Sequence, residues 1–97
     1  MSEKRDAYVK KVQAKLDEWN AEIDRLEAKA ESAAADARVQ YEEQIAKAKA
    51  SRDDLRQKLG EIRKAGDEAW QELKSGLDQA WDSLSAAVKS ARSKFDE

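Results

Sequence analysis

The sequence predicts an all-α fold, a long helical hairpin or coiled coil that assembles as an oligomer. Proline is absent and glycine occurs three times in 97 residues, so residues that break helices are rare. Charged residues make up 41% and apolar residues 40% of the chain, and alanine is the commonest apolar residue. This composition is typical of long helices. The spacing of the larger apolar residues then defines each element.

The first predicted element is a helix over about residues 3–64. Its apolar residues recur at alternating steps of three and four, which is a heptad pattern with a mean period of about 3.5. The strongest part of this pattern is the predicted oligomer seam, made of Val9, Val12, Leu16, Trp19, Ile23 and Leu26. Further along, two successive steps of four at Ala37, Tyr41 and Ile45 form a stutter, which locally unwinds a supercoil.

The second predicted element is a shorter helix over about residues 67–95. Its apolar steps follow a three-four-four order, so Trp70 and Trp81 stand eleven residues apart. Eleven residues make three turns at about 3.67 residues per turn, and this repeat keeps one face apolar along the helix. The predicted seam of this helix consists of Trp70, Leu73, Leu77, Trp81, Leu84, Val88 and Phe95.

A turn or kink is predicted at residues 64–67. Gly66 follows two basic residues and can take the left-handed conformation that ends a helix, and Asp67 can then cap the next one. The alternative is one continuous long helix, because a glycine inside a helix costs only about 1 kcal/mol. The apolar pattern also keeps its phase across Gly66, as a continuous helix requires.

In the hairpin, residues at equal distances from Gly66 become neighbours. Trp70 then lies beside Ile62, and Trp81 lies beside Arg52, where a cation–π contact would explain an arginine on the apolar stripe. The two arms are unequal, and residues 4–37 extend beyond the short arm by about 50 Å. We therefore expect other copies of the chain to cover this overhang, in an antiparallel two-fold dimer or a higher bundle. Residues 1–97 are interpreted as a single coiled-coil element.

The residues offer little for catalysis or for cofactor and metal binding. Cysteine and histidine are absent, and adjacent carboxylates on a solvated helix face do not form an acid–base pair. Acidic residues four apart, such as Glu18 with Glu22 and Asp78 with Asp82, have the spacing for a divalent cation, but metal sites in helix bundles combine Glu with His. We expect no enzyme, no catalytic residue, no cofactor and no metal.

Charge and hydropathy limit the partners. The net charge is −2 with no basic patch, which disfavours nucleic acid. No apolar segment has the length of a membrane span, and the first residues lack the apolar core of a secretory signal. The expected location is the cytoplasm.

Two segments resemble a family of small bacterial coiled-coil proteins of unknown function. They are YVKKVQAKLDEWNAEIDRLEAKA at 8–30 and EAWQELKSGLDQAWDSLSAAVKSA at 68–91. The most specific motif is A-W-x-x-L-x-x-G-[LV]-x-x-A-W-x-x-L at 69–84. The resemblance implies a helical coiled coil from a bacterium and no activity. The eleven-residue repeat is also similar to those of apolipoproteins and of phasins, which coat storage granules, although the basic edges common in lipid-binding repeats are missing.

Two functions follow as hypotheses. The first is a non-enzymatic, self-associating coiled-coil scaffold or partner-binding module, whose partner protein the sequence does not specify. The alternative is an amphipathic protein that binds a lipid or polymer-granule surface through its tryptophan face, as apolipoproteins or phasins do. A disordered protective protein is disfavoured, because a disordered chain has no need of the heptads at residues 9–26.

Overall fold

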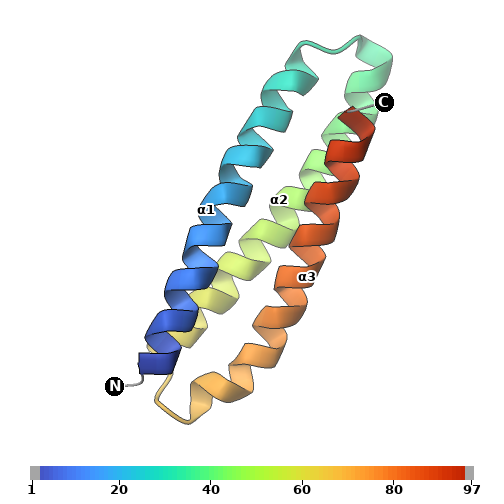
Figure 1. Ribbon diagram of the computed structural model, residues 1–97. Helices are drawn as coiled ribbons and strands as arrows, with labels where there is room; N and C mark the ends of the chain where they lie inside the picture. The colour runs from blue at the N-terminus through green and yellow to red at the C-terminus, as the bar shows by residue number, and fades with distance from the viewer. Residues whose placement is uncertain (1–2, 96–97) are drawn as a thin grey trace.

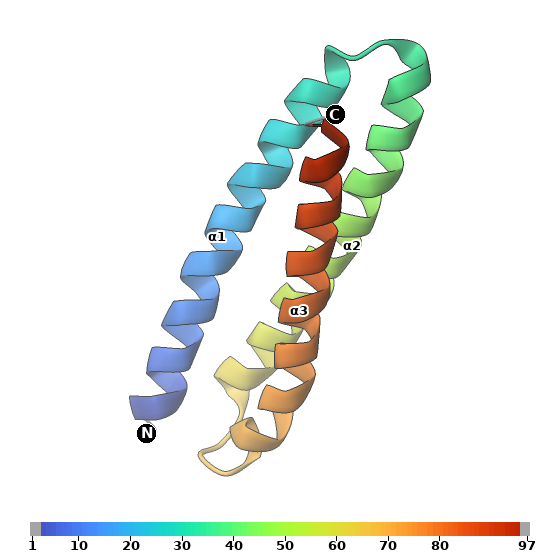
Figure 2. The same ribbon diagram turned by 45° about the vertical axis from the view of Figure 1, so that its right-hand side comes forward.

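The computed structural model describes residues 3–95, apart from the side chain of Phe95. Three helices account for nearly all of this chain: α1 (Glu3–Glu31), α2 (Ala35–Lys64) and α3 (Ala69–Phe95). They form an up-down-up bundle in which α2 runs antiparallel to α1 and α3 (Figure 1, Figure 2). The bundle is a narrow rod of 51 × 18 × 18 Å. The prediction of an all-α fold is therefore confirmed.

The prediction of one helix over residues 3–64 is wrong, and so is the alternative of a single continuous helix. The chain leaves the helical conformation at residues 32–34, and α1 folds back along α2. As a result, residues 4–37 do not overhang the rest of the chain. The structure is a bundle of three helices, where the sequence predicted a hairpin of two unequal arms.

A comparison of magnitudes explains the fold-back. A break in the helix forfeits a few backbone hydrogen bonds, each with a net value of about 0.5–1.5 kcal/mol. In return, the large side chains on one face of α1 become buried, and each contributes about 1.5–3 kcal/mol. Leu16, Ile23 and Leu26 are at most 2% exposed, so burial in the chain's own core outweighs the cost of the break.

The first connection, residues 32–34, contains neither glycine nor proline. It consists of Ser32, Ala33 and Ala34, and the last turn of α1 tightens so that the Ser32 N–H donates to the Lys29 carbonyl at 3.1 Å. Ala34 is the residue before α2, with φ −62° and ψ 152°, and its side chain cannot cap the helix. Instead, the Arg38 guanidinium reaches back from α2 and donates to the carbonyl oxygens of Ala30 at 3.3 Å and Glu31 at 2.6 Å.

The second connection lies where the sequence predicted a turn. The chain reverses over residues 65–68, so that α3 packs antiparallel to α2. The predicted left-handed conformation of Gly66 is wrong, because no residue of the described chain has a positive φ. The helix ends instead when Ala65 becomes extended and its N–H donates to the Ile62 carbonyl at 3.1 Å. Asp67 lies in the turn, and α3 begins two residues later.

One apolar core runs the length of the bundle. All three helices contribute to it, and it contains no buried polar or charged residue among those described. Its largest fully buried side chains are Leu16, Ile23, Leu26, Leu55, Leu59, Ile62, Leu77 and Leu84. Each helix therefore uses the apolar stripe that the periodicity predicts, and the stripes of the three helices meet along one axis.

Candidate interaction surface

The predicted oligomer seam on α1 is an intramolecular seam. Val12, Leu16, Trp19, Ile23 and Leu26 are buried, and Val9 is half-buried against the same core. The helices that cover them are α2 and α3 of the same chain. The overhang that required a second chain is absent, so this seam gives no reason of its own to expect an oligomer.

The predicted seam of the second helix also faces the core. Trp70, Leu77, Leu84 and Val88 are buried, while Leu73 and Trp81 are partly buried. The side chain of Phe95 lies outside the described part of the chain. Of the two partly buried residues, Trp81 lines a hollow on the surface between α1 and α3.

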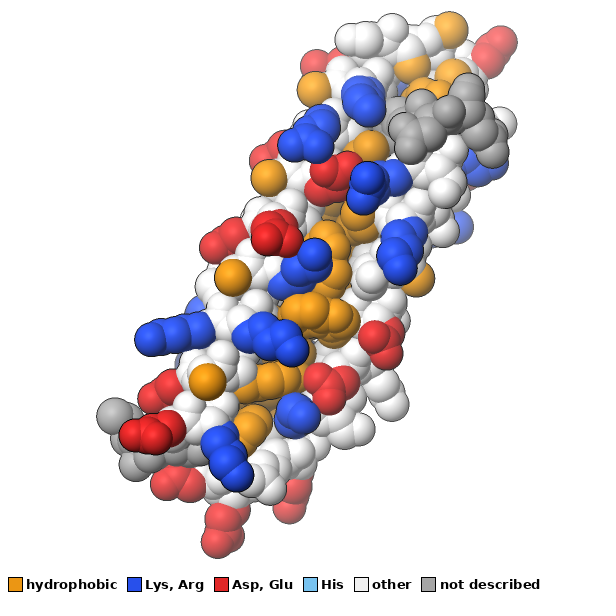
Figure 3. Space-filling view, viewed as in Figure 1, with side chains coloured by type: hydrophobic (Ala, Val, Ile, Leu, Met, Phe, Trp, Pro, Cys, Tyr) orange, Lys and Arg blue, Asp and Glu red, His pale blue; other side chains and the backbone are white. Residues whose placement is uncertain are grey.

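A shallow groove separates α1 from α3, and we call it the α1/α3 groove. It exists because α1 and α3 each pack more extensively on α2 than on each other. Figure 3 shows an apolar band along it with charged side chains on both edges. Two hollows lie in it: a lower one of about 200 Å³ lined by Tyr8, Lys11, Val12, Asp78, Trp81 and Asp82, and an upper one of about 240 Å³ lined by Lys15, Glu18, Trp19, Glu22, Ser85, Val88, Lys89 and Arg92.

Aromatic contacts join the two walls of the groove. The rings of Trp19 and Trp81 meet edge to face, with centroids 4.9 Å apart. Nearer the N-terminus, the ring of Tyr8 lies 5.9 Å from that of Trp70. The groove is thus closed at its floor by ring contacts, while the side of Trp81 stays accessible from solvent.

Tyr8 is also tied to α3 by a hydrogen bond. Its hydroxyl donates to Oδ1 of Asp78 at 2.6 Å, across the groove. Burial raises the pKa of Tyr8 well above its ordinary value, and the hydrogen bond to Asp78 and the negative charge of that carboxylate raise it further. The tyrosine therefore stays protonated and remains a donor to Asp78 at neutral pH.

Charges along the groove change sign halfway up both walls. In the lower half, Lys11 of α1 shares a hollow with Asp78 and Asp82 of α3. In the upper half, Glu18 and Glu22 of α1 face Lys89 and Arg92 of α3, and Lys15 of α1 lines the same hollow. Arg92 Nε lies 3.4 Å from Glu22 Oε1. The two parallel helices are thus matched in charge along their length, which supports their side-by-side placement.

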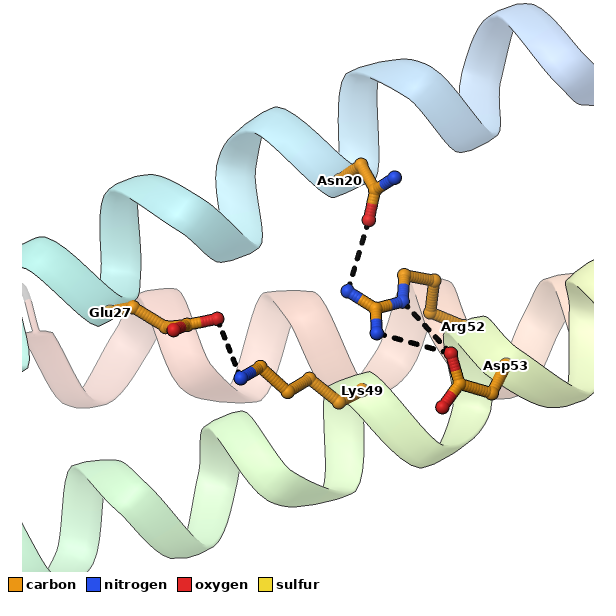
Figure 4. Close-up of polar contacts among 5 residues, drawn as sticks. All are labelled: Asn20, Glu27, Lys49, Arg52 and Asp53. Carbon is orange, nitrogen blue, oxygen red and sulfur yellow. Dashed lines mark hydrogen bonds and ion pairs between the residues drawn. The ribbon is translucent and has the colours of Figure 1, made fainter.

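Polar contacts at the other edge of α1 attach it to α2 (Figure 4). The Arg52 guanidinium donates from Nη1 to Oδ1 of Asn20 at 3.1 Å, and it also pairs with Asp53. One helical turn away, Lys49 Nζ lies 2.8 Å from Glu27 Oε1. The predicted stacking of Arg52 on Trp81 is wrong: the ring partner of Trp81 is Trp19, and Arg52 points toward α1.

Sequence reasoning overlooked the residues that hold α1 in place. Asn20, Glu27 and Arg38 are polar and lie off the apolar stripe, so periodicity gives no reason to select them. Tyr8 lies within residues 4–37, where the sequence predicted an overhang, and its hydroxyl is the group that bonds to Asp78. Once α1 is known to fold back, the opposite charges of Glu27 and Lys49 indicate how α1 and α2 align.

The remaining surface offers little for chemistry. Within residues 3–95 no three acidic side chains gather closely enough to hold a metal ion. In the same part of the chain, none of the helices combines the length and the apolar character needed to cross a membrane. The large apolar side chain most open to solvent there is Val39, on α2.

Comparisons of the chain with protein-family models, with curated proteins and with solved structures each gave no match. The resemblance to small bacterial coiled-coil proteins therefore stays a prediction.

Proposed function

We propose that this protein is a non-enzymatic helical scaffold that associates with a second copy of itself through the α1/α3 groove. The observation that carries the proposal is the symmetry of the charges along the groove. On α1, the midpoint in sequence between Lys11 and Glu22 lies between residues 16 and 17. The pair Lys15 and Glu18 has the same midpoint. A two-fold axis at that level places each lysine opposite a glutamate of an antiparallel second copy.

The wall formed by α3 repeats this arrangement. The midpoint in sequence is near residue 85 both for Asp78 with Arg92 and for Asp82 with Lys89. The same antiparallel pairing therefore places each acidic residue of this helix opposite a basic residue of the second copy. The four α1 charges and the four α3 charges line the two hollows. The same two-fold rotation therefore pairs opposite charges along both α1 and α3, which is the self-complementarity that a two-fold interface requires.

The size of this face is consistent with such an interface. A side face of the rod measures 51 by 18 Å, which is comparable to the roughly 800 Å² that each partner contributes to a standard stable interface. The exposed side of Trp81 would lie near the centre of the contact, where aromatic residues contribute most to binding.

The test is the mass of the protein in solution, measured by analytical ultracentrifugation over a range of concentrations. One variant carries Lys11→Glu and Lys15→Glu, and a second carries Glu18→Lys and Glu22→Lys. Each should associate more weakly than the parent chain because like charges then face each other. Mixed in equal amounts, the two variants should form a heterodimer, since every acidic position then faces a basic one.

The matched control changes two lysines outside the groove, Lys10→Glu with Lys47→Glu, and should associate like the parent chain. A parent chain that stays monomeric at all concentrations would refute the proposal. A monomer whose tryptophan emission shifts to the blue on addition of neutral phosphatidylcholine vesicles would favour the lipid-surface alternative instead. An association that the groove variants leave unchanged would place the interface elsewhere.

A further inference from the structure

We infer that α1 is an exchangeable helix: residues 32–34 straighten, and two copies of the chain trade α1, so that α1 of each packs on α2 and α3 of the other. Exchange of an identical element between copies replaces contacts within a chain by the same contacts between chains. The inference goes beyond the proposed function, because it uses the α1–α2 connection and needs no contact between two grooves.

The composition of the connection is the first argument. Residues 28–37 read AKAESAAADA, with no glycine, proline or asparagine. Alanine has the highest helix propensity, whereas turns normally use residues that favour other conformations. The bend therefore exists because folding back buries the face of α1, and the local sequence itself favours a helix.

At the bend, the conformation of Ala34 differs from that of a helix in ψ. Ala34 has φ −62°, which is the value of an α-helix, and only its ψ of 152° is extended. The hydrogen bonds of Ser32 to Lys29 and of Ala33 to Ala30 are those of a tightened last turn, at 3.1 Å each. Rotation about one ψ angle at Ala34 and relaxation of that turn would join α1 to α2.

The register of the polar contacts is the second argument. Among the side-chain pairs that join α1 to α2 are Gln13 with Arg63, Asn20 with Arg52, and Glu27 with Lys49. The residues halfway between the members of each pair are 38, 36 and 38. If residues 31–38 become helical, a two-fold axis at about residue 37 reproduces all three pairs between two antiparallel chains.

The residues at that axis suit a close crossing of two helices. Ala37 would lie on the axis, with Ala30 and Ala33 on the same stripe, and small side chains allow helices to approach. Asp36 and Arg38 flank Ala37, so Asp36 of each chain would stand opposite Arg38 of the second copy. Arg38, which caps the end of α1 in the closed bundle, would then gain a carboxylate partner in exchange for two carbonyl oxygens.

The helix that moves is the one held least. The packing of α3 on α2 is the most extensive in the bundle, and that of α1 on α3 is the least. Separation of α1 therefore leaves the α2–α3 hairpin as the unit that receives α1 of the second copy.

The experiment uses the absence of cysteine in the natural chain. One chain carries Glu27→Cys and another carries Lys49→Cys, and a short thiol crosslinker is added after the two are unfolded together and refolded at high concentration. We expect a covalent heterodimer. A chain that carries both cysteines, refolded at low concentration, is the control and should crosslink within itself.

Ala35→Pro tests the hinge directly. Position 35 is the first residue of α2, where proline is favoured, and Ala34 before it is already extended, as a residue before proline must be. In the exchanged dimer, position 35 lies inside a helix, where proline lowers the equilibrium constant on the order of 100-fold. The variant should keep the folded monomer, seen as parent-like circular dichroism, and lose the crosslinked heterodimer.

Two results of the co-refolding experiment would overturn the inference. One is the absence of a heterodimer on co-refolding, and the other is a heterodimer whose yield Ala35→Pro does not change. The groove variant Lys11→Glu with Lys15→Glu separates this inference from the proposed function. It should leave the crosslinked heterodimer intact even where it abolishes association through the groove, and loss of the crosslink in that variant would also count against exchange.

Discussion

The indole rings of Trp19 and Trp81 meet edge to face, with centroids 4.9 Å apart and planes at 72°. These residues stand on helices that the sequence placed in different interfaces, one between chains and one within the hairpin. Their contact joins α1 to α3 at the floor of the groove. It is also the place where the stability of the bundle and its proposed association depend on the same side chains.

Removal of these rings should show both their separate and their shared contributions. Trp19 is 7% exposed, so Trp19→Ala should lower the free energy of unfolding by about 3–5 kcal/mol. Trp81→Ala should cost less, because Trp81 is only partly buried. A double-mutant cycle by urea denaturation should give a coupling of about 0.5–1.5 kcal/mol. Additive losses would show that the ring contact contributes nothing of its own.

Tyr8 predicts a loss of stability at alkaline pH. Its pKa is raised in the folded protein by burial, by its bond to Asp78 and by the charge of Asp78. The folded state then holds its proton more tightly than the unfolded state, so this contribution is complete below the ordinary tyrosine pKa of about 10 and is lost as the pH rises above it. The free energy of unfolding should therefore fall more steeply above that pH in the parent chain than in Tyr8→Phe. Equal slopes in the two proteins would exclude this role for Tyr8.

The bond between Asn20 and Arg52 should be measurable as a coupling between α1 and α2. Asn20→Ala and Arg52→Ala should each reduce the free energy of unfolding by about 1 kcal/mol, and the double variant should lose less than the sum. The matched cycle of Arg52→Ala with Trp81→Ala should show no coupling, because Arg52 points away from that ring. Coupling in the second cycle would restore the cation–π contact that the sequence predicted.

Ala34→Ser should stabilise the bundle. Ala34 precedes α2 in extended geometry and provides no side-chain cap, and a serine there can accept a hydrogen bond from the first turn, worth about 0.5–2 kcal/mol. The control is Ala46→Ser, at an exposed position inside α2, where serine should be slightly destabilising. Thermal melts followed by circular dichroism compare the two. A lower melting temperature for Ala34→Ser would show that this end of α2 is not formed as described.

Gly60→Ala should also raise stability. Gly60 lies inside α2, and a methyl group added to it would meet nothing within 4 Å. Alanine in a helix interior is favoured over glycine by about 0.5–1 kcal/mol. Gly66→Ala is the comparison, since Gly66 lies in the turn, where helix propensity does not act. If Gly66→Ala stabilised the protein as much as Gly60→Ala, the stabilisation would not come from helix propensity.

The sequence predicted which face of each helix is buried, but it did not predict the first bend. Periodicity selected Leu16, Ile23, Leu77 and Leu84, all of which are in the core. It selected them correctly because the apolar stripe of a helix faces its neighbours whether these belong to the same chain or to another. For the same reason it could not decide which chain provides those neighbours, and that was where the prediction failed.

The bend at residues 32–34 had no local signal. Ala33 and Ala34 favour a helix, and the cap for the end of α1 comes from Arg38, which lies beyond the bend. The stutter at Ala37, Tyr41 and Ile45 lies inside α2, shortly after the true break. At Gly66, by contrast, a turn residue followed basic residues, and the predicted reversal lies there.

The odd number of helices has a consequence for anything joined to this chain. Because α1 and α3 run in the same direction, the start of α1 and the end of α3 lie toward opposite ends of a rod 51 Å long (Figure 1). Two domains fused to these ends would be held apart by a rigid spacer, whereas a two-helix hairpin with equal arms would bring them together. Fluorescence energy transfer between dyes at positions 3 and 94 would measure this separation.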